Sequence, residues 1–377
     1  MRKSYFLMAA AATMFAACSQ NDALNEAQVQ DEAQAIGFST YAGKVTRAEN
    51  NKTPYSQDLE KHHLDFDVWA GKKVNDATQA VYAIDSKGVV AYDDNTWTAN
   101  PLKYWDKVAS EYYFYAGAPS SSSWQFAMTE AGNYATGYLK YEYFKLNGEN
   151  IADGTNAYGT TWADARAVND IDLMIAAPKK VERVFYNVTS PTLPGKVEMQ
   201  FNHILSRLNI MVKKGENIDA NHKLVLKSLT VYGLKNKGSF DENKEEADQT
   251  AKTSRWYDQS VDGTYELTAA VPATEVTGAV YTHQYLVIPQ TISSSSVDVN
   301  GTTADMADNP YFRIEYTIAD EVYFAYYNLA SAFSANSLSF NEGWQNTLTI
   351  TINPNVINFD ATVSEWGTYL DRGTELE

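Results

Sequence analysis

The sequence contains very little cysteine, because Cys18 is the only thiol in 377 residues. No disulfide can form within the chain, so the fold has to be stabilised by its hydrophobic core alone. The same scarcity excludes a redox-active pair of cysteines. A single cysteine this close to the start of a long chain therefore needs an explanation other than structural cross-linking.

Basic residues and long apolar runs are also scarce. The chain has 47 acidic and 30 basic residues, and its formal net charge is −17. This balance gives no electrostatic basis for binding nucleic acid or anionic lipid head groups. No apolar run reaches the roughly 20 residues that a membrane-spanning helix requires. At 42.0 kDa the chain is nevertheless long enough for two domains with cores of their own.

The N-terminus has the features of a secretory signal peptide over residues 1–17. Arg2 and Lys3 precede an apolar run that ends at Ala17, with small residues before Cys18. The run Phe15–Cys18 resembles the bacterial lipobox. This resemblance implies cleavage between Ala17 and Cys18 and lipidation of Cys18 with acyl chains such as palmitate, which would anchor the protein to a membrane. The alternative is an ordinary secretion signal with an incidental cysteine.

A polar tether and a short strand follow the signal peptide. Residues 18–35 carry four acids and neither basic nor aromatic side chains, so we expect a flexible tether. Ile36, Phe38 and Thr40 then alternate with small or polar residues, which predicts a β-strand. A basic bond at Arg47–Ala48 follows in a polar stretch with no strand signal.

The remaining sequence predicts an all-β fold. Aromatic residues make up 13% of the chain, and short alternating runs recur between Gly, Asn, Asp, Ser and Pro. Residues 64–70 and 112–119 read as strands, and residues 311–329 read as a hairpin with Phe312, Ile314, Tyr316 and Ile318 on one face. At the end of the chain, alternation predicts two more strands, one through Leu348, Ile350 and Ile352 and one through Ile357, Phe359, Ala361 and Val363.

The alternation changes phase once, near Asn202–His203. Val197, Met199 and Phe201 follow one phase, and Leu208, Ile210 and Val212 follow the other, which requires a bulge or a short turn. Two prolines and a glycine precede this run in Ser190–Lys196. We therefore predict a boundary between an N-terminal domain at residues 36–192 and a C-terminal domain at 193–377.

No catalytic or metal-binding pattern stands out, so we predict neither an enzyme nor a bound metal or cofactor. The five histidines form no metal-ligating motif, and His203 is interpreted as a hydrogen-bonded structural residue. Asp93–Asn95 and Asn169–Asp172 could bind calcium, but turn formation explains them better. Exposed tryptophans could form a sugar-binding platform, although packing on a sheet is the favoured interpretation; the candidates are Trp97, Trp105, Trp124 and Trp162.

Several stretches carry a family resemblance through their order along the chain. They are Ile36–Ala48, Tyr104–Pro119, Ile171–Ala177, Phe201–Ile210, Val231–Phe240, Tyr285–Thr291 and Ile357–Trp366. Together with Cys18 and the acidic tether, they resemble the fimbrillins, the type V pilus subunits of anaerobic Gram-negative bacteria of gut and mouth. The resemblance implies two tandem transthyretin-like Greek-key β-sandwich domains, and export as a lipoprotein to the outer membrane and cell surface.

The same resemblance implies a way of assembly. The N-terminal strand with Ile36, Phe38 and Thr40 would be removed by cleavage between Arg47 and Ala48, and subunits would join into a fimbria by donor-strand exchange. A sandwich that lacks one strand exposes an apolar groove and unpaired backbone groups, which a neighbour's strand can fill. The C-terminal run Ile357–Val363 is a candidate donor, unless it closes its own domain. The alternative function is a monomeric surface lipoprotein that binds glycans.

Overall fold

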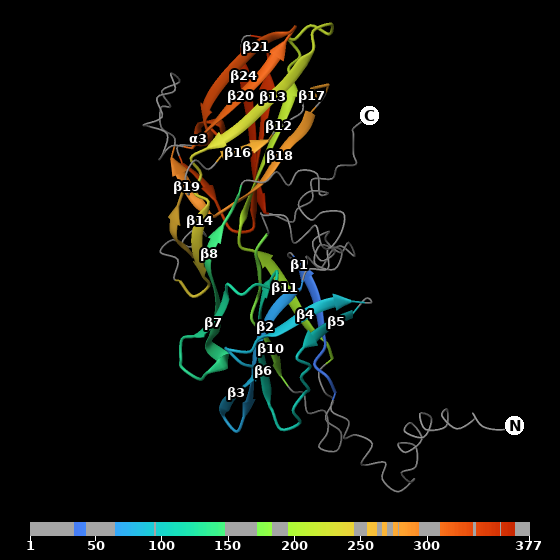
Figure 1. The fold of residues 1–377 in the computed structure, drawn as a ribbon, viewed down its shortest axis with the longest axis vertical. Coiled ribbons are helices and arrows are strands. Elements are labelled where there is room, and N and C mark those ends of the chain that lie inside the picture. The colour runs from blue at the N-terminus through green and yellow to red at the C-terminus, as the bar shows by residue number, and fades with distance from the viewer. Residues whose placement is uncertain are drawn as a thin grey trace, which may run out of the picture.

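The computed structural model describes residues 34–42, 65–93, 96–147, 172–182, 195–244, 255–261, 266–269, 274–277, 279–293, 310–334, 337–354 and 356–365. These residues form an all-β fold, as the composition predicted. Within them, helix is limited to the short turn η2 (Tyr134–Thr136) and to α3 (Leu329–Ala332). Figure 1 shows an elongated arrangement, with the first strands of the chain at one end and the last strands at the other.

The strands at one end form a single sheet that closes on itself. Its order is β10-β6-β9-β11-β1-β5-β4-β2-β3, and β6 also pairs with β2. The extra pairing makes a ring of seven strands, with β10 and β3 attached outside it. The strands are β1 (Phe38–Ala42), β2 (Phe66–Val74), β3 (Ala77–Tyr82), β4 (Gly88–Asp93), β5 (Thr96–Asn100), β6 (Glu111–Ala118), β9 (Met174–Ala176), β10 (Lys179–Glu182) and β11 (Val197–His203).

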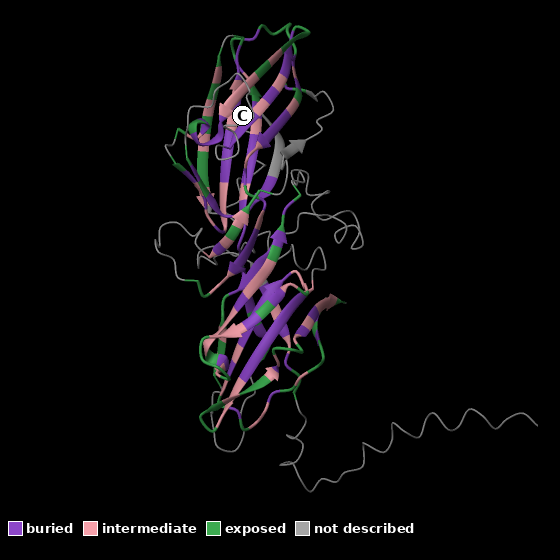
Figure 2. Cartoon of the chain, turned by 60° about the vertical axis from the view of Figure 1, so that its left-hand side comes forward, coloured by how far each residue is buried: buried purple, intermediate pink, exposed green. Residues whose placement is uncertain are grey.

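The interior of this ring is a compact aromatic core. Phe66 and Val68, which lie in the strand predicted at residues 64–70, are both fully buried in it. On β5, Trp97 and Ala99 are buried while their neighbours are exposed, which is the alternation of a strand with one face on the core. Figure 2 shows such buried stretches along the strands at both ends of the molecule.

The last strands of the chain form two sheets at the other end. One has the order β18-β12-β23-β24, and the other β16-β13-β20-β21 with β17 beside β13. Phe312 and Phe359 bring the two sheets together, with ring centroids 5.9 Å apart. The strands are β12 (Ser206–Lys214), β13 (Leu224–Tyr232), β16 (Glu266–Ala269), β17 (Thr274–Glu275), β18 (Ala279–Val287), β20 (Tyr311–Ile318), β21 (Glu321–Asn328), β23 (Trp344–Ile352) and β24 (Ile357–Glu365).

The predicted hairpin is formed by β20 and β21. Its two turn residues, Ala319 and Asp320, have φ of 51° and 68°, as a tight hairpin turn of this twist requires. Tyr323, Ala325 and Tyr327 on the returning strand pack against the core. Val322 and Phe324 lie on the opposite face and are 54% and 52% exposed.

A fourth sheet joins the two ends and has the order β15-β14-β8-β7. Its strands are β7 (Trp124–Met128), β8 (Gly137–Lys145), β14 (Lys237–Asp241) and β15 (Trp256–Ser260), and a small sheet of β19 (Gln290–Ser293) and β22 (Ser337–Phe340) also occurs. The pairing of β8 with β14 connects segments that lie on either side of residues 192 and 193. Strand β11, which follows residue 193, pairs with β1 and β9 of the first sheet. The first sheet and the β15-β14-β8-β7 sheet therefore each contain strands from both sides of the predicted boundary at residues 192 and 193.

The predicted change of phase near Asn202–His203 is the point where the chain passes from the first sheet to the C-terminal sheets. Strand β11 ends at His203 and β12 begins at Ser206. Ile204 and Leu205, between them, are fully buried. The Ile204 N–H donates to Leu173 O at 3.0 Å, and Leu205 O accepts from Gly343 N at 2.9 Å. The crossing is therefore packed and hydrogen-bonded to both ends.

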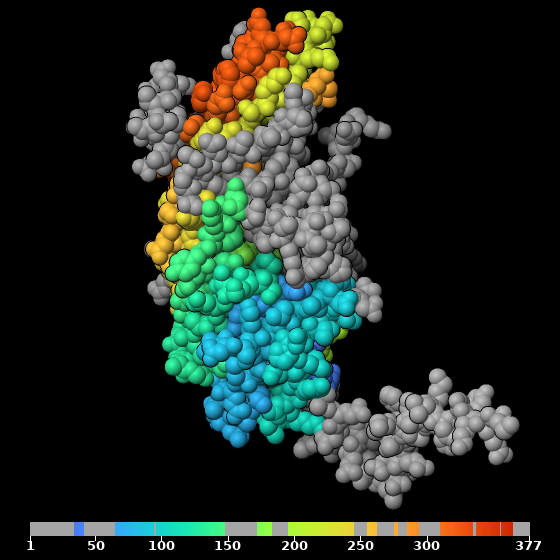
Figure 3. All heavy atoms as spheres, viewed as in Figure 1, coloured from blue at the N-terminus to red at the C-terminus, as the bar shows by residue number. Residues whose placement is uncertain are grey.

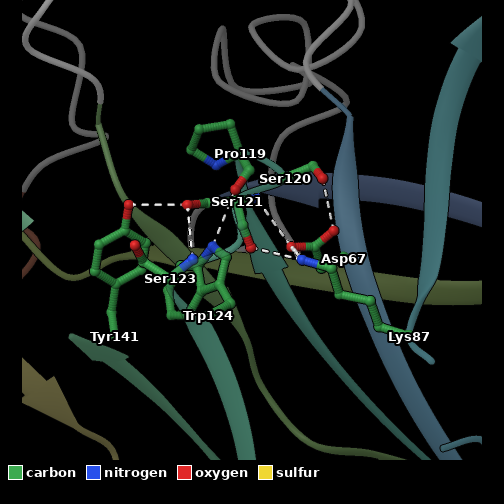
Figure 4. Close-up of polar contacts among 8 residues, drawn as sticks. All are labelled: Asp67, Lys87, Pro119, Ser120, Ser121, Ser123, Trp124 and Tyr141. Carbon is green, nitrogen blue, oxygen red and sulfur yellow. Dashed lines mark hydrogen bonds and ion pairs between the residues drawn. The ribbon is translucent and has the colours of Figure 1, made fainter. Parts of the chain in front are cut away.

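Asp67 on β2 is a fully buried carboxylate that ties three segments together (Figure 4). It accepts hydrogen bonds from Ser120 Oγ at 2.6 Å and from Ser121 N at 2.9 Å, and Lys87 Nζ lies 2.5 Å from it. Lys87 also donates to Ser121 O at 2.5 Å. The serine run Ser120–Ser123 lies in the loop between β6 and β7, and its first half is anchored to β2.

We expect Asp67→Ala to lower the free energy of unfolding by about 2–3 kcal/mol, because Lys87 and Ser120 then lose their buried acceptor. The value is at the low end for a broken buried pair, since the Lys87 side chain is 25% exposed and can reach water. Urea unfolding followed by tryptophan fluorescence measures it.

The matched control is Glu182→Ala. The Glu182 carboxylate lies 2.8 Å from Lys180 Nζ but is 66% exposed, so its loss should leave the unfolding midpoint nearly unchanged. Equal destabilisation by both substitutions would contradict the role assigned to Asp67.

Candidate functional site

Strand β1 occupies the place that closes the ring of the first sheet. It pairs in parallel with β11, Phe38 to Ala42 lying opposite Val197 to Phe201. On its other side it is antiparallel to β5, and the only register pair there is Phe38 with Trp97. Figure 1 shows β1 beside β11, although most of the first sheet separates them in sequence. The first strand that the structure describes is thus an interior strand of a closed sheet.

The pairing of this segment begins before β1 itself. Ile36 N donates to Lys103 O at 2.9 Å, and Trp105 N donates to Gln34 O at 3.0 Å. Further along, Val197 N donates to Gly37 O at 2.8 Å. Residues 34–42 are therefore held along their length by two separate backbone partners, the 103–105 segment and β11.

Phe38 is the central side chain of this contact. Its ring meets those of Phe66 and Phe114 edge to face, each with centroids 6.0 Å apart. Phe66 in turn contacts Phe201 of β11 at 5.2 Å. Ile36 and Phe38 are each 1% exposed, and burying a side chain of this size contributes about 1.5–3 kcal/mol. Phe66 and Phe114, with Phe201 packed against Phe66, therefore form a socket for Phe38 that fixes the register of β1.

Loss of β1 would open the first sheet. Strands β11 and β5 would become edges with unpaired backbone groups, and the aromatic interior would face solvent along the vacated position. Such a groove is chemically suited to one kind of occupant, an extended strand that supplies both backbone hydrogen bonds and apolar side chains.

The predicted processing residues lie outside the described residues. These are Ala17, Cys18, Arg47 and Ala48. The three predicted strand residues, Ile36, Phe38 and Thr40, lie together on the buried face of the 34–42 segment. Because this segment lies between Cys18 and Arg47 in sequence, a cut after Arg47 would disconnect all of it from the body.

His203 and Asp172 form a buried pair beside this site. Asp172 precedes β9, His203 ends β11, and the imidazole Nδ1 is hydrogen-bonded to the carboxylate. Both side chains are almost fully buried. The arrangement agrees with the structural role predicted for His203. It also gives Asp172, one of the acids considered for calcium, a protein partner.

The tryptophans considered for a sugar-binding platform are not available as one. Trp97, Trp105 and Trp124 are 7%, 3% and 4% exposed, and Trp162 lies outside the described residues. Their rings pack against other aromatic side chains, as Trp105 does against Tyr112. Trp97, Trp105 and Trp124 therefore form no sugar-binding platform, and the favoured interpretation, packing on the sheets, is confirmed for them.

The titratable groups with large shifts are buried tyrosines. Burial raises the pKa of Tyr82 and of Tyr115 to about 12, and it also raises the pKa of Tyr285. A phenol of this kind stays protonated and donates, as Tyr115 OH does to Tyr134 O at 2.8 Å. Within the described part of the chain, no group of three His, Cys, Asp or Glu side chains could hold a metal ion. No helix in that same part is long and apolar enough to cross a membrane.

Sequence reasoning missed the residues that form the socket. Phe66, Phe114 and Phe201 lie in segments predicted to be strands, but nothing local connects them with Phe38. Their alternation shows that each faces a core. Only the pairing order of the sheet brings them together around β1.

The fold is similar to that of a solved Bacteroides protein. A fimbrial protein from Bacteroides vulgatus aligns with a TM-score of 0.52 and 16% identity, over 88% of this chain and 99% of that chain. A candidate cell adhesion protein from Bacteroides ovatus aligns with a TM-score of 0.48 and 12% identity, over 89% and 98% of the two chains. A candidate cell adhesion protein from Bacteroides uniformis aligns with a TM-score of 0.44 and 17% identity, over 89% of this chain and 98% of that chain. At 16% identity, the similarity to the Bacteroides vulgatus protein shows a similar fold and nothing about function.

The sequence itself identifies the family. No curated protein sequence matches the chain. The fimbrillin-like family profile matches residues 46–366, which include every described strand from β2 to β24. The chain therefore belongs to the fimbrillin-like family.

Proposed function

We propose that this chain is a structural subunit of a cell-surface fimbria, and that β1 is its temporary built-in strand. The subunit is exported to the outer membrane as a lipoprotein on Cys18, matured by cleavage after Arg47, and joined to other subunits by donor-strand exchange. Membership of the fimbrillin-like family supports a pilus-type adhesion subunit at the cell surface. Export, cleavage and exchange are the parts that the proposal adds.

The position of β1 is the observation that carries the proposal. Strand exchange needs a strand that is central to the fold and yet can be disconnected from it. Strand β1 lies between β11 and β5 in a closed ring, and it is the first described strand of the chain. One cut at Arg47 would therefore disconnect β1 and leave every other described strand in the body.

Covalent connection decides whether β1 stays in place. A short flexible link keeps the strand at an effective concentration of about millimolar order, which a neighbour's strand does not match. After a cut, β1 is held only by its own contacts, the buried Ile36 and Phe38 and the ladder with β11. Its weak contact with β5, one register pair, leaves one side open to competition.

The candidate donor Ile357–Val363 lies in β24, which is paired along its whole length with β23. Phe359 also packs against Phe312 and Tyr327 of the facing sheet. These contacts support the alternative in which Ile357–Val363 closes its own domain. Strand β24 could donate to a neighbour only if its own sandwich first lost an edge strand.

We retain two tandem transthyretin-like Greek-key sandwiches as the proposed domain organisation. Two separate hydrophobic clusters support two units, one inside the first sheet and one extending through the rest of the described fold. The pairing of β11 with β1 and β9 supports extending the N-terminal unit to His203, beyond the predicted residue 192.

A structural role accounts for the site without catalysis, so we propose that the chain is not an enzyme and needs no cofactor. The buried His203–Asp172 pair and the buried tyrosines are explained by packing and hydrogen bonding. The alternative of a monomeric glycan-binding lipoprotein has lost the platform that motivated it, since three of its four tryptophans are buried.

Arg47→Ala should abolish both maturation and assembly. With the full chain, an arginine-specific trypsin-like protease should release the N-terminal segment and give laddered oligomers on unheated gels. The variant should stay monomeric, because the connected β1 outcompetes any neighbour's strand. Mass spectrometry of the products identifies the bond that is cut.

The matched control is Lys52→Ala, which removes a basic residue from the same polar stretch and should assemble like the wild type. Filaments formed by Arg47→Ala, or a cut wild-type chain that stays monomeric, would contradict the exchange mechanism.

Cys18→Ala should transfer the protein from the membrane fraction to the soluble periplasmic fraction, because acyl chains cannot be attached without the thiol. Fractionation of cells expressing each form measures this, with Ser19→Ala as the control that should remain membrane-bound. Unchanged outer-membrane partitioning of Cys18→Ala would show that the cysteine is incidental.

A further inference from the structure

One side chain on the buried face of β1 fits its surroundings poorly. Ile36 and Phe38 are apolar, but Thr40 places a hydroxyl in the same interior and is only 8% exposed. Its Oγ1 is fully shielded, and among the described residues no hydrogen-bond partner reaches it. Thr40 lies opposite Met199, an apolar residue of β11 that is itself fully buried.

A buried hydroxyl without a partner weakens the binding of the strand that carries it. In water the hydroxyl is hydrogen-bonded, and on insertion it gives up those bonds without replacement. Valine has nearly the same shape and no hydroxyl. A strand identical to β1 but with Val at this position would therefore bind the same groove more tightly.

Phe38, in contrast to Thr40, strengthens the binding of β1. Its ring fills the space between Phe66 and Phe114, so a strand without a large side chain there would leave a void in the core. Phe38 thereby fixes the register of the strand, and Thr40, which lies two residues further along, limits the affinity of the strand for the groove. Gly37 lies between Ile36 and Phe38, and a Cβ added there would meet Lys196 Cγ at 3.3 Å, a contact that a surface lysine can relieve.

We propose that Thr40 makes β1 replaceable, and that the groove selects another subunit's extended strand with an aromatic residue at the Phe38 position and Val or Ile at the Thr40 position. The strand runs parallel to β11, as β1 does. This inference rests on the proposed strand exchange and adds the chemistry of the incoming partner. The resident strand keeps the interior closed until it is cut, and its shielded hydroxyl then allows a better-matched strand to displace it.

The test measures how long the cut segment stays on the body. The full chain and its Thr40→Val variant are cut after Arg47, and retention of the released segment is followed by size-exclusion chromatography and mass spectrometry. An excess of a synthetic nonapeptide with the sequence of residues 34–42 is present as a trap. The Thr40→Val segment should dissociate about ten-fold more slowly, which corresponds to about 1.4 kcal/mol.

Ser39→Val is the matched control. It introduces the same side chain one position earlier, on the opposite face of the strand, where Ser39 is only half-buried. Its segment should dissociate at the wild-type rate. Equal slowing by Ser39→Val and Thr40→Val would show a general preference of valine for strands and would overturn the inference, as would a Thr40→Val segment that leaves at the wild-type rate.

A second measurement does not depend on how the variant chain folds. The wild-type body, once cut, is given the 34–42 nonapeptide with either Thr or Val at the Thr40 position, each labelled with a fluorophore. The Val peptide should bind about ten-fold more tightly by fluorescence polarisation. Equal affinities would overturn the inference.

These readouts separate the inference from the proposed function, because retention and peptide binding require no polymer. Slower release of the Thr40→Val segment without any laddered oligomers from the wild type would support the role of Thr40 and contradict fimbrial assembly. Ladders that form equally fast from wild type and Thr40→Val would support assembly and contradict the role of Thr40.

Discussion

Closure of the first sheet by β1 is the constraint on which the rest of the structure depends. The ring has no edge only because a five-residue strand pairs with β11 on one side and meets β5 on the other. The aromatic core is centred on the same strand, since Phe38 contacts rings from β2 and β6. Backbone pairing and core packing therefore depend on a single segment at the start of the chain, and whatever controls that segment controls whether the subunit is closed or receptive.

The two ends of the molecule are joined by packing and not by a linker. Ile204 and Leu205 cross from β11 to β12 fully buried, and the Trp256 indole donates to Ile204 O at 2.9 Å. One hydrophobic cluster runs from Trp69 and Tyr115 through β7 and β8 into the C-terminal sheets. Figure 3 shows the corresponding surface, with the first half of the chain at one end and the last third at the other. Close-packed interiors transmit strain, so a load on β1 would reach the C-terminal sheets through this core.

Much of the secondary structure could be predicted from the sequence, because alternation is a local property. The buried face of β23 and the change of phase before Ile204 follow from it directly. The partners of a strand within a sheet, in contrast, cannot be predicted from the strand's own residues. That β11 joins the first sheet and that β8 pairs with β14 depends on contacts between distant segments. The candidate strand could be proposed from Ile36, Phe38 and the nearby Arg47, whereas its socket could not. Aromatic content alone does not determine burial either, since Trp97 is buried and Phe324 is half-exposed.

The parallel pairing of β1 with β11 has a consequence for the polymer. An incoming strand that takes the same hydrogen bonds to β11 must run in the same direction, so each subunit receives its neighbour in one orientation. In the proposed exchange the donating segment and the receiving groove belong to different parts of the chain, and such a contact is head-to-tail. A head-to-tail contact that does not close into a ring repeats without limit and produces a filament. Directional pairing at one buried strand is thus sufficient, with the proposed exchange, to explain why subunits of this fold would assemble into fimbriae and not into closed dimers.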